Sequence, residues 1–194
     1  MTSPTLVLGS TSRYRAELLS RLYPTFEQRS PGTDEAALHG ETPHDRALRL
    51  AIAKAHAAAE GLEDALVIGS DQVAELEGLV LDKPGTVERA RAQLAASSGR
   101  EVHFHTALCL HDTRSGRDLI HVDHTRVHFR SLDAGEIARY VEREQPLDCA
   151  GSFKCEGLGI SLFERIDNED PSALIGLPLI ALARLLRESG MALP

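Results

Sequence analysis

Asp71 is the residue of this chain best placed for chemistry, in the stretch ALVIGSDQV at residues 65–73. Residues 65–68 form an unbroken apolar run, which is typical of a strand buried on both faces, and Gly69 and Ser70 end it. Asp71 then follows the carboxyl end of the strand, where open α/β sheets bind their ligands. The strand alone favours a simpler alternative, a turn in which Asp71 caps backbone donors.

A donor-rich turn, Gly-Ser-Thr-Ser, follows the first expected strand at Thr5–Leu8. Ser12 is placed to cap a helix over residues 13–22, so free amides and the positive end of the helix dipole face this turn, as phosphate binding requires. Ser10 lies in the turn, and Arg15 could reach back over it from the helix. Because the spacing of a P-loop is absent, an ordinary strand-to-helix connection is the alternative.

Two further charged residues come from the next segments. A helix is expected over residues 43–59, with Thr42 as N-cap and Pro43 at its first position. Lys54 stands at the edge of the apolar stripe of this helix, where it could bind a ligand or extend to water. Glu35 lies in the preceding loop and would by default be a solvated charge. The stripe is predicted to consist of Leu48, Ala51, Ile52 and Ala55.

The remaining segments predict an α/β order. A hairpin of Val73–Glu75 with Leu79–Leu81 delivers Lys83, whose direction Pro84 fixes. The segment Leu147–Gly159 contains three glycines and is predicted to be a functional loop. The other expected elements are a helix capped by Thr86 and ending near Ala96, strands at 25–28, 102–111, 118–129 and 160–163, a helix from Asp133 and a helix at 178–189.

Composition restricts the classes of function. The 194 residues carry a formal charge of −8, which argues against binding to nucleic-acid polymers or anionic membranes. Three cysteines cannot all pair, and neither a signal peptide nor a membrane-spanning apolar run is visible, so we expect a cytoplasmic protein. Among the nine histidines, residues 103, 105, 121, 124 and 128 fall on two expected strands, which favours solvated strand faces over a three-histidine metal site.

No linker or repeat interrupts the chain, so residues 1–194 are expected to form a single domain, with two lobes around a central cleft. In order and spacing, seven short segments resemble the Maf family of nucleoside triphosphate pyrophosphatases over nearly the full length. They are LGSTSRYRAELL at 8–19, Asp34-Glu35, Ala53-Lys54-Ala55, IGSDQV at 68–73, DKP at 82–84, LDCAGSFKCEG at 147–157 and DPSALIGLPL at 170–179.

The resemblance implies an α/β fold of the Maf/ITPase-like kind, with an elongated mixed sheet flanked by helices and a deep cleft. It also implies hydrolysis of a small-molecule nucleotide between its α and β phosphates, with a divalent cation, usually Mg2+. The products would be a nucleoside monophosphate and pyrophosphate. Whether the chain forms a homodimer is left undecided by the resemblance.

The resemblance assigns roles in catalysis and phosphate binding to six residues. Ser10, with Arg15, Lys54 and Lys83, would neutralise the phosphates. Glu35 and Asp71 would hold the magnesium ion. Asp71 would also accept the proton of the attacking water, although a metal-bound carboxylate is a weaker base and could mainly orient a metal-bound water.

Three positions resemble the family members that act on 7-methyl-GTP, namely Tyr14, Gln72 and Glu156. Because 7-methylguanine is cationic, an aromatic face at Tyr14 can stack on it with a cation–π contribution of about 0.5–2 kcal/mol. Glu156 can accept from the guanine N1 and N2 hydrogens while opposing the positive charge. The alternatives are a partly buried core aromatic at Tyr14 and a loop charge at Glu156.

One position departs from the family, because Arg13 stands where its members usually have proline. Proline at the first helical position rigidifies the start of a helix. We therefore expect Arg13 to loosen the turn slightly or to add a cation beside the phosphates.

Three other functions remain open. The chain could be a pyrophosphatase of the same family for dTTP, UTP or another non-standard nucleotide. A nucleotidyltransferase needs a glycine-rich first loop, but Gly9 is the only glycine before Gly32. A non-catalytic nucleotide-binding regulator of cell division would bind nucleotide without releasing pyrophosphate.

Overall fold

A computed structural model describes residues 4–193 of the chain. Its strands are β1 (Thr5–Gly9), β2 (Glu27–Arg29), β3 (Ala65–Leu76), β4 (Leu79–Val80), β5 (Glu101–Asp112), β6 (Arg117–Phe129) and β7 (Phe163–Asp167). Its α-helices are α1 (Arg13–Leu22), α2 (Pro43–Ala59), α3 (Val87–Ser97), α4 (Ala134–Glu144) and α5 (Leu179–Glu188). None of these described helices is long and apolar enough to cross a membrane.

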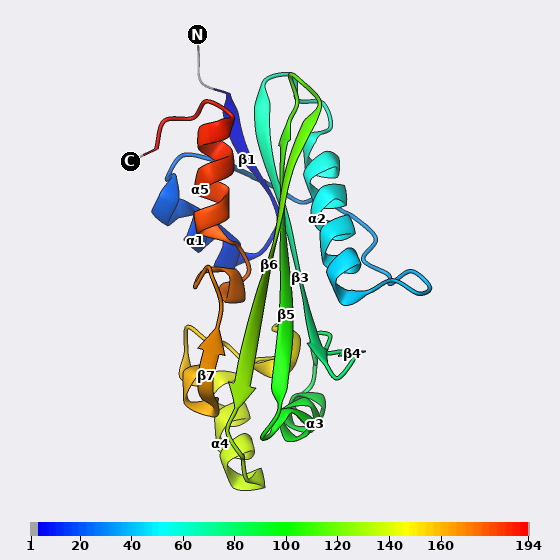
Figure 1. The fold of residues 1–194 in the computed structure, drawn as a ribbon, viewed down its shortest axis with the longest axis vertical. Helices are drawn as coiled ribbons and strands as arrows, with labels where there is room; N and C mark the ends of the chain where they lie inside the picture. Colours follow the sequence, from blue (N-terminus) through cyan, green and yellow to red (C-terminus); the bar gives the residue numbers. More distant parts are fainter. Residues whose placement is uncertain (1–3, 194) are drawn as a thin grey trace. The chain divides into compact units, whose positions relative to one another are not determined.

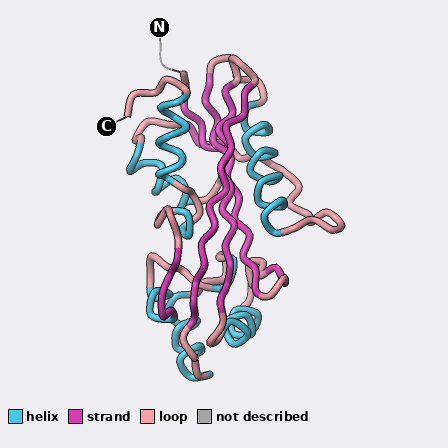
Figure 2. The backbone as a smooth tube through the Cα atoms, viewed as in Figure 1, coloured by secondary structure: helices cyan, strands magenta, loops and turns pink. Residues whose placement is uncertain are grey.

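The strands form a mixed sheet in the order β2-β1-β3-β5-β6-β7, with β4 paired to β3 (Figures 1 and 2). β1 runs parallel to both β2 and β3, whereas the β3–β4 and β6–β7 pairs are antiparallel. The predicted α/β class with a mixed sheet is confirmed.

Side-chain caps fix the starts of four helices where the sequence predicts them. The side chains of Ser12, Thr42 and Thr86 each accept a hydrogen bond from the amide three residues further on. Asp133 forms a reciprocal capping box with Glu136 at the start of α4. Each cap satisfies a backbone donor that the first helical turn leaves without a partner.

The chain divides into two compact units. Unit 1 comprises residues 1–71, 106–123 and 170–194, and unit 2 comprises residues 72–105 and 124–169. The chain passes from unit 1 into unit 2 within β3, between Asp71 and Gln72. Unit 2 has an aromatic core in which Phe153 meets Phe104, Phe129 and Phe163 edge to face.

In unit 1, alternate residues of the central strands are buried on opposite faces. Leu66 and Ile68 belong to a core cluster with residues of α1 and α5, whereas Val67 packs with Ala58 and Ala59 of α2. Figure 1 shows α1 and α5 on one side of these strands and α2 on the other. The prediction that residues 65–68 form a strand buried on both faces is confirmed.

Glycines let α2 approach the sheet closely. A Cβ atom at Gly69 of β3 would overlap the carbonyl oxygen of Ala51 and lie 2.9 Å from Cβ of Ala55. A Cβ at Gly9 of β1 would lie 2.8 Å from Cβ of Ala58. Small residues on both partners therefore set the distance between α2 and the strands.

Two predicted boundaries are wrong. Gly69 and Ser70 do not end the strand, because β3 continues to Leu76, and Asp71 lies inside it rather than in a turn beyond it. The last strand is β7 at Phe163–Asp167, whereas residues 158–162 form a 3-10 helix. In both cases neighbouring strands supply the backbone partners, which local sequence does not reveal.

We predict that Gly69→Ala lowers the free energy of unfolding by about 3 kcal/mol or more, because the added methyl group meets backbone atoms of α2 that cannot move aside. Gly135→Ala in α4 is the matched control, since its Cβ would meet only the ends of the Arg139 and Asp133 side chains. Urea unfolding measures both. Equal stabilities of the two variants would contradict the close approach.

Candidate functional site

Lys54 is the centre of a charged cluster in unit 1. Its Nζ atom lies 2.6 Å from Oδ1 of Asp71 and 2.6 Å from Oε1 of Glu35. Lys54 and Asp71 are only 6% and 7% exposed, whereas just over half of the Glu35 side chain is exposed. The structure thus brings together three of the predicted site residues, as a buried ion pair with one solvent-facing carboxylate.

The alternation along β3 places Asp71 on the same face as Val67 and Gly69, toward α2. On α2, Lys54 lies inside the buried stripe and not at its edge. The buried residues of this helix are Ala47, Leu50, Ala51, Lys54, Ala55, Ala58 and Ala59. The predicted stripe is therefore rotated, and Lys54 does not extend to water because Asp71 is its partner in the interior.

The turn after β1 is organised around the Ser10 hydroxyl, which accepts from the Ser12 amide at 3.1 Å and from Nη1 of Arg15 at 3.4 Å. Gln28 donates to the Ser10 carbonyl oxygen at 2.7 Å. Ser10 is 4% exposed. The predicted pairing of Arg15 with this turn is therefore present.

Ser70 and the carbonyl of Gly176 are site neighbours that sequence reasoning missed. The Arg15 Nε atom donates to the Gly176 oxygen at 2.8 Å, and the buried Ser70 hydroxyl lies 3.0 Å from the same oxygen. Ser70 also lies 2.8 Å from the carbonyl oxygen of Ala107. The sequence feature that could have identified Ser70 is its position next to Asp71. Neighbouring residues of a strand face opposite sides of the sheet, so Ser70 must face away from Asp71.

Arg15 remains a cation in this setting. Desolvation by burial lowers the pKa of its guanidinium, and the charges of Asp71 and Glu35 oppose that shift. Because an arginine pKa starts far above neutrality, the side chain stays protonated. It is therefore a fixed positive charge above the Ser10 turn.

Asp170 holds the segment that carries Gly176. Its carboxylate accepts from the Ile180 amide at 2.7 Å and from the Ser172 amide at 3.0 Å, and the Ser172 hydroxyl accepts from the Leu179 amide at 2.8 Å. These bonds satisfy donors at the start of α5. The DPSALIGLPL segment thus fixes the backbone against which Arg15 is held.

Arg13 packs on Tyr14. Its guanidinium carbon lies 4.7 Å from the centroid of the Tyr14 ring, and Nη2 donates to the Tyr14 hydroxyl at 2.8 Å. α1 begins at Arg13 with the Ser12 cap formed. One face of the aromatic ring predicted to contact the base is therefore covered by a cation from the same chain.

Three predicted residues lie in unit 2. Lys83 and Glu156 are exposed, and Gln72 is half-buried in β3. Glu156 accepts from the Cys155 thiol at 3.5 Å. Burial, followed by the charge of Glu156, raises the pKa of the Cys155 thiol to about 12, so it stays protonated.

The segment around Glu156 is anchored on both sides. Phe153 is buried in the aromatic core, and Nζ of Lys154 donates to the Glu144 carbonyl oxygen at 3.0 Å. On the other side, the Leu158 amide donates to Oε2 of Glu144 at 2.8 Å. Glu156 is thus presented to solvent from a fixed backbone.

The donor set can be compared with what a metal requires. Glu35 and Asp71 direct carboxylate oxygens toward one positive charge, the Lys54 ammonium, and oxygen ligands of this kind suit magnesium. Within residues 4–193, the group of three side chains spaced to hold a metal ion is a different one, His56, His111 and Asp118. It contains none of the predicted site residues.

Residues 5–189 match the family model described as Maf-like protein. The chain belongs to the Maf-like family. Two Maf-like relatives are named 7-methyl-GTP pyrophosphatase: one from Burkholderia thailandensis is 56% identical over 98% of this chain and 90% of its own, and one from Xanthomonas oryzae pv. oryzae is 57% identical over 98% and 100%.

The fold also resembles that of a Staphylococcus aureus Ham1 protein. The TM-score is 0.51, with 17% identity over 95% of this chain and 99% of the other. Because the identity is low, this likeness supports the fold of this Maf-like chain and carries nothing about its substrate.

We predict that Lys54→Met lowers the free energy of unfolding by about 3–5 kcal/mol, because it leaves the Asp71 carboxylate buried without its partner. Adding Asp71→Asn should restore part of the loss, which a double-mutant cycle in urea measures. Arg184→Met, which breaks an exposed ion pair with Glu188, is the control and should change stability by less than about 1 kcal/mol. A loss at Lys54 no larger than the control would refute the buried pair.

Proposed function

We propose that this chain is a pyrophosphatase that hydrolyses 7-methyl-GTP to 7-methyl-GMP and pyrophosphate. The observation that carries the proposal is the buried Lys54–Asp71 pair with Glu35 at its open side. The names of the two relatives, more than half identical to this chain over nearly its whole length, supply the substrate.

The residues of unit 1 can neutralise a polyphosphate. Attack at the α phosphorus requires that the charge of the triphosphate be balanced while it is held in place. Arg15 is held above the Ser10 turn at the start of α1 by hydrogen bonds to Ser10 and Gly176, and Lys54 is buried on α2. Lys83, exposed after β4 in unit 2, is proposed as a further phosphate ligand.

Asp71 is proposed as the group that orients the attacking water and accepts its proton. Glu35 and Asp71 would hold magnesium, since both already direct an oxygen at a cation and magnesium takes one or two protein carboxylates together with phosphate oxygens. When bound, the ion would offset phosphate charge and lower the pKa of water. The hydrogen bond from Lys54 holds the Asp71 carboxylate in place, which supports its role in orienting the attacking water.

Base recognition is proposed for Tyr14, Gln72 and Glu156. The ring of Tyr14 already binds a planar cation, the Arg13 guanidinium, on one face. Glu156 is an exposed carboxylate on an anchored segment and accepts a hydrogen bond from the neighbouring Cys155 thiol. A cationic base is complementary to the Tyr14 ring through cation–π stacking, and its two N–H donors are complementary to a carboxylate such as that of Glu156.

We also propose that residues 1–194 act as one cytoplasmic domain. The family model spans residues 5–189, which include both compact units, and β3, β5 and β6 each contain residues of both. The three cysteines are free thiols, which suits a reducing compartment.

For catalysis, we predict that Asp71→Asn lowers turnover of 7-methyl-GTP by at least about a hundredfold, the usual contribution of a positioned proton acceptor. Pyrophosphate release is measured with magnesium, and chelation by EDTA should abolish it in the wild type. Asp34→Asn is the matched control in the loop beside Glu35 and should keep full activity. Equal rates for both variants would exclude the role of Asp71, and nucleotide binding by the wild type without pyrophosphate release would indicate a regulator.

For specificity, we predict that Glu156→Gln lowers kcat/KM for 7-methyl-GTP about tenfold or more, because it removes a charge-assisted hydrogen bond. Rates with dTTP and UTP, whose bases lack the guanine N1 and N2 hydrogens, should change much less. Glu164→Gln, at an exposed position of β7, serves as control. A uniform loss of activity on all three nucleotides would assign Glu156 a structural role. Faster turnover of dTTP or UTP than of 7-methyl-GTP by the wild type would contradict the proposal that 7-methyl-GTP is the substrate.

A further inference from the structure

We propose that His56, His111 and Asp118 form a second site, which binds a divalent transition metal of the zinc class. The site uses none of the residues assigned to nucleotide hydrolysis and does not rest on that assignment. All three side chains belong to unit 1.

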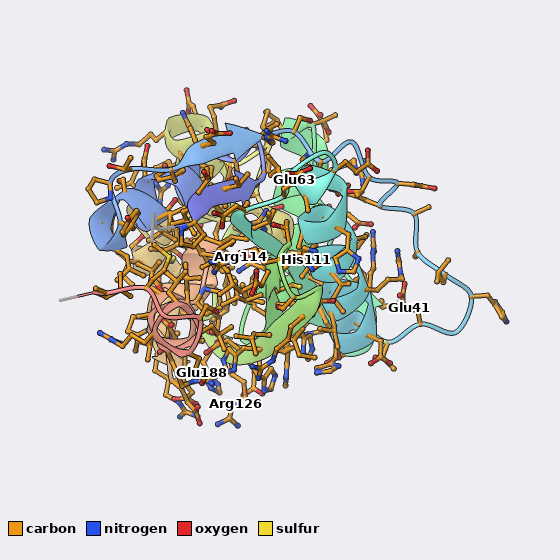
Figure 3. The ribbon with its side chains drawn as sticks, turned by 90° about the horizontal axis from the view of Figure 1, so that it is seen from above. Glu41, Glu63, His111, Arg114, Arg126 and Glu188 are labelled. Carbon is orange, nitrogen blue, oxygen red and sulfur yellow. The ribbon has the colours of Figure 1, made fainter. Side chains whose placement is uncertain are left out.

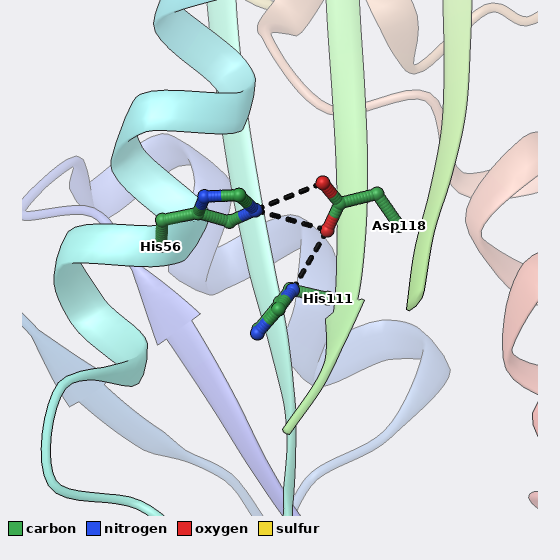
Figure 4. A group of neighbouring side chains, drawn as sticks. All are labelled: His56, His111 and Asp118. Atoms are coloured by element: carbon green, nitrogen blue, oxygen red, sulfur yellow. Dashed lines mark hydrogen bonds and ion pairs between the residues drawn. The ribbon is translucent and has the colours of Figure 1, made fainter. Parts of the chain in front are cut away.

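The three side chains converge in the structure (Figure 4). Nε2 of His56 lies 2.8 Å and 3.1 Å from the two carboxylate oxygens of Asp118, and Nδ1 of His111 lies 2.7 Å from Oδ1. One ligand atom from each residue lies within 4.8 Å of the other two. The ring centroids of the two histidines are 4.6 Å apart, so two imidazoles and a carboxylate already share one small volume.

Separate elements hold the three ligands in register. His56 is two residues beyond Lys54 on α2, so it lies away from the buried stripe and is exposed. His111 is the penultimate residue of β5 and Asp118 is the second residue of β6. They lie on either side of a turn that Thr113 ties to the start of β3 by three hydrogen bonds with Ala65. Figure 3 shows His111 beside the ribbon of α2.

This donor set selects the class of metal. Two imidazole nitrogens and one carboxylate oxygen suit zinc, and also nickel or copper, better than magnesium or calcium, which prefer oxygen ligands. Three protein ligands leave a fourth position for water. His56 and Asp118 are partly exposed, which gives the ion a route of entry.

Binding requires a simple proton rearrangement. The nitrogens that face Asp118 now carry its hydrogen bonds, and each must present a lone pair to the metal. In a neutral imidazole the proton then resides on the opposite ring nitrogen, while a protonated imidazole releases one proton to solvent. The Asp118 carboxylate changes from hydrogen-bond acceptor to ligand, and nothing is oxidised or reduced.

A histidine group in unit 2 is less suited to this role. In unit 2, Nδ1 of His103 lies 2.9 Å from Nε2 of His124, and His124 stacks between His103 and His105 at 5.0 Å from each. Within residues 4–193, this pair does not belong to a group of three ligand atoms that all lie within 4.8 Å of one another. This pair therefore provides an internal control for nonspecific binding to histidine.

The test is calorimetric titration of the EDTA-stripped full chain with ZnCl2 in excess MgCl2. One zinc ion per chain is expected for the wild type and for Asp71→Asn, whose hydrolytic site is disabled. His56→Gln and Asp118→Asn should each weaken zinc binding at least about tenfold, since loss even of an indirect partner commonly has this effect. CoCl2 should give a ligand-field absorption band that these variants lose.

Controls separate this site from general surface binding. His121→Gln on β6 and His124→Gln should keep wild-type zinc affinity. Zinc should also raise the melting temperature of the wild type and of these two controls, but not that of His56→Gln. Because His56 is exposed, this substitution should not itself disturb the fold. Equal zinc affinity in all variants, or a loss that follows His124 instead, would overturn the proposal.

Discussion

The close contact of α2 with β1 and β3 is the constraint on which the rest of unit 1 depends. Backbone at Gly69 lies against the Ala51 carbonyl, and Gly9 lies against Ala58, so no side chain separates helix and sheet there. Alanines on the helix complete the contact. At this distance the lysine on α2 reaches the carboxylate that follows on the same face of β3, and the charged pair is buried with it.

The buried pair is better understood as a positioning device than as a source of stability. Desolvation of two charges offsets much of their attraction, so an apolar pair of similar volume would serve folding as well. What the charges add is direction: Lys54 holds Asp71 and Glu35 at fixed distances. On the other face of β3, Ser70 performs the corresponding task for the Gly176 backbone, opposite Arg15.

Local patterns were sufficient for the helices, because caps such as Thr42, Thr86 and Asp133 act within three residues. They also identified residues 65–68 as a strand buried on both faces. They failed where distant backbone decides the outcome: pairing with neighbouring strands extends β3 through Asp71, and the Asp71 carboxylate draws Lys54 inward. The Gly176 carbonyl could not be predicted, since a backbone acceptor carries no side-chain signature.

The contact of Arg13 with Tyr14 changes the net free energy that a ligand can gain by stacking on that ring. A planar cation that stacks on the covered face has to displace the guanidinium first, so its gain there is the difference between two similar contacts of about 0.5–2 kcal/mol each. Stacking of a cation on that face would exchange one cation for another, nearly neutral in free energy. An uncharged ring stacked there would give up the Arg13 contact without an equivalent return, so the covered face would disfavour neutral ligands while adding little affinity for cationic ones.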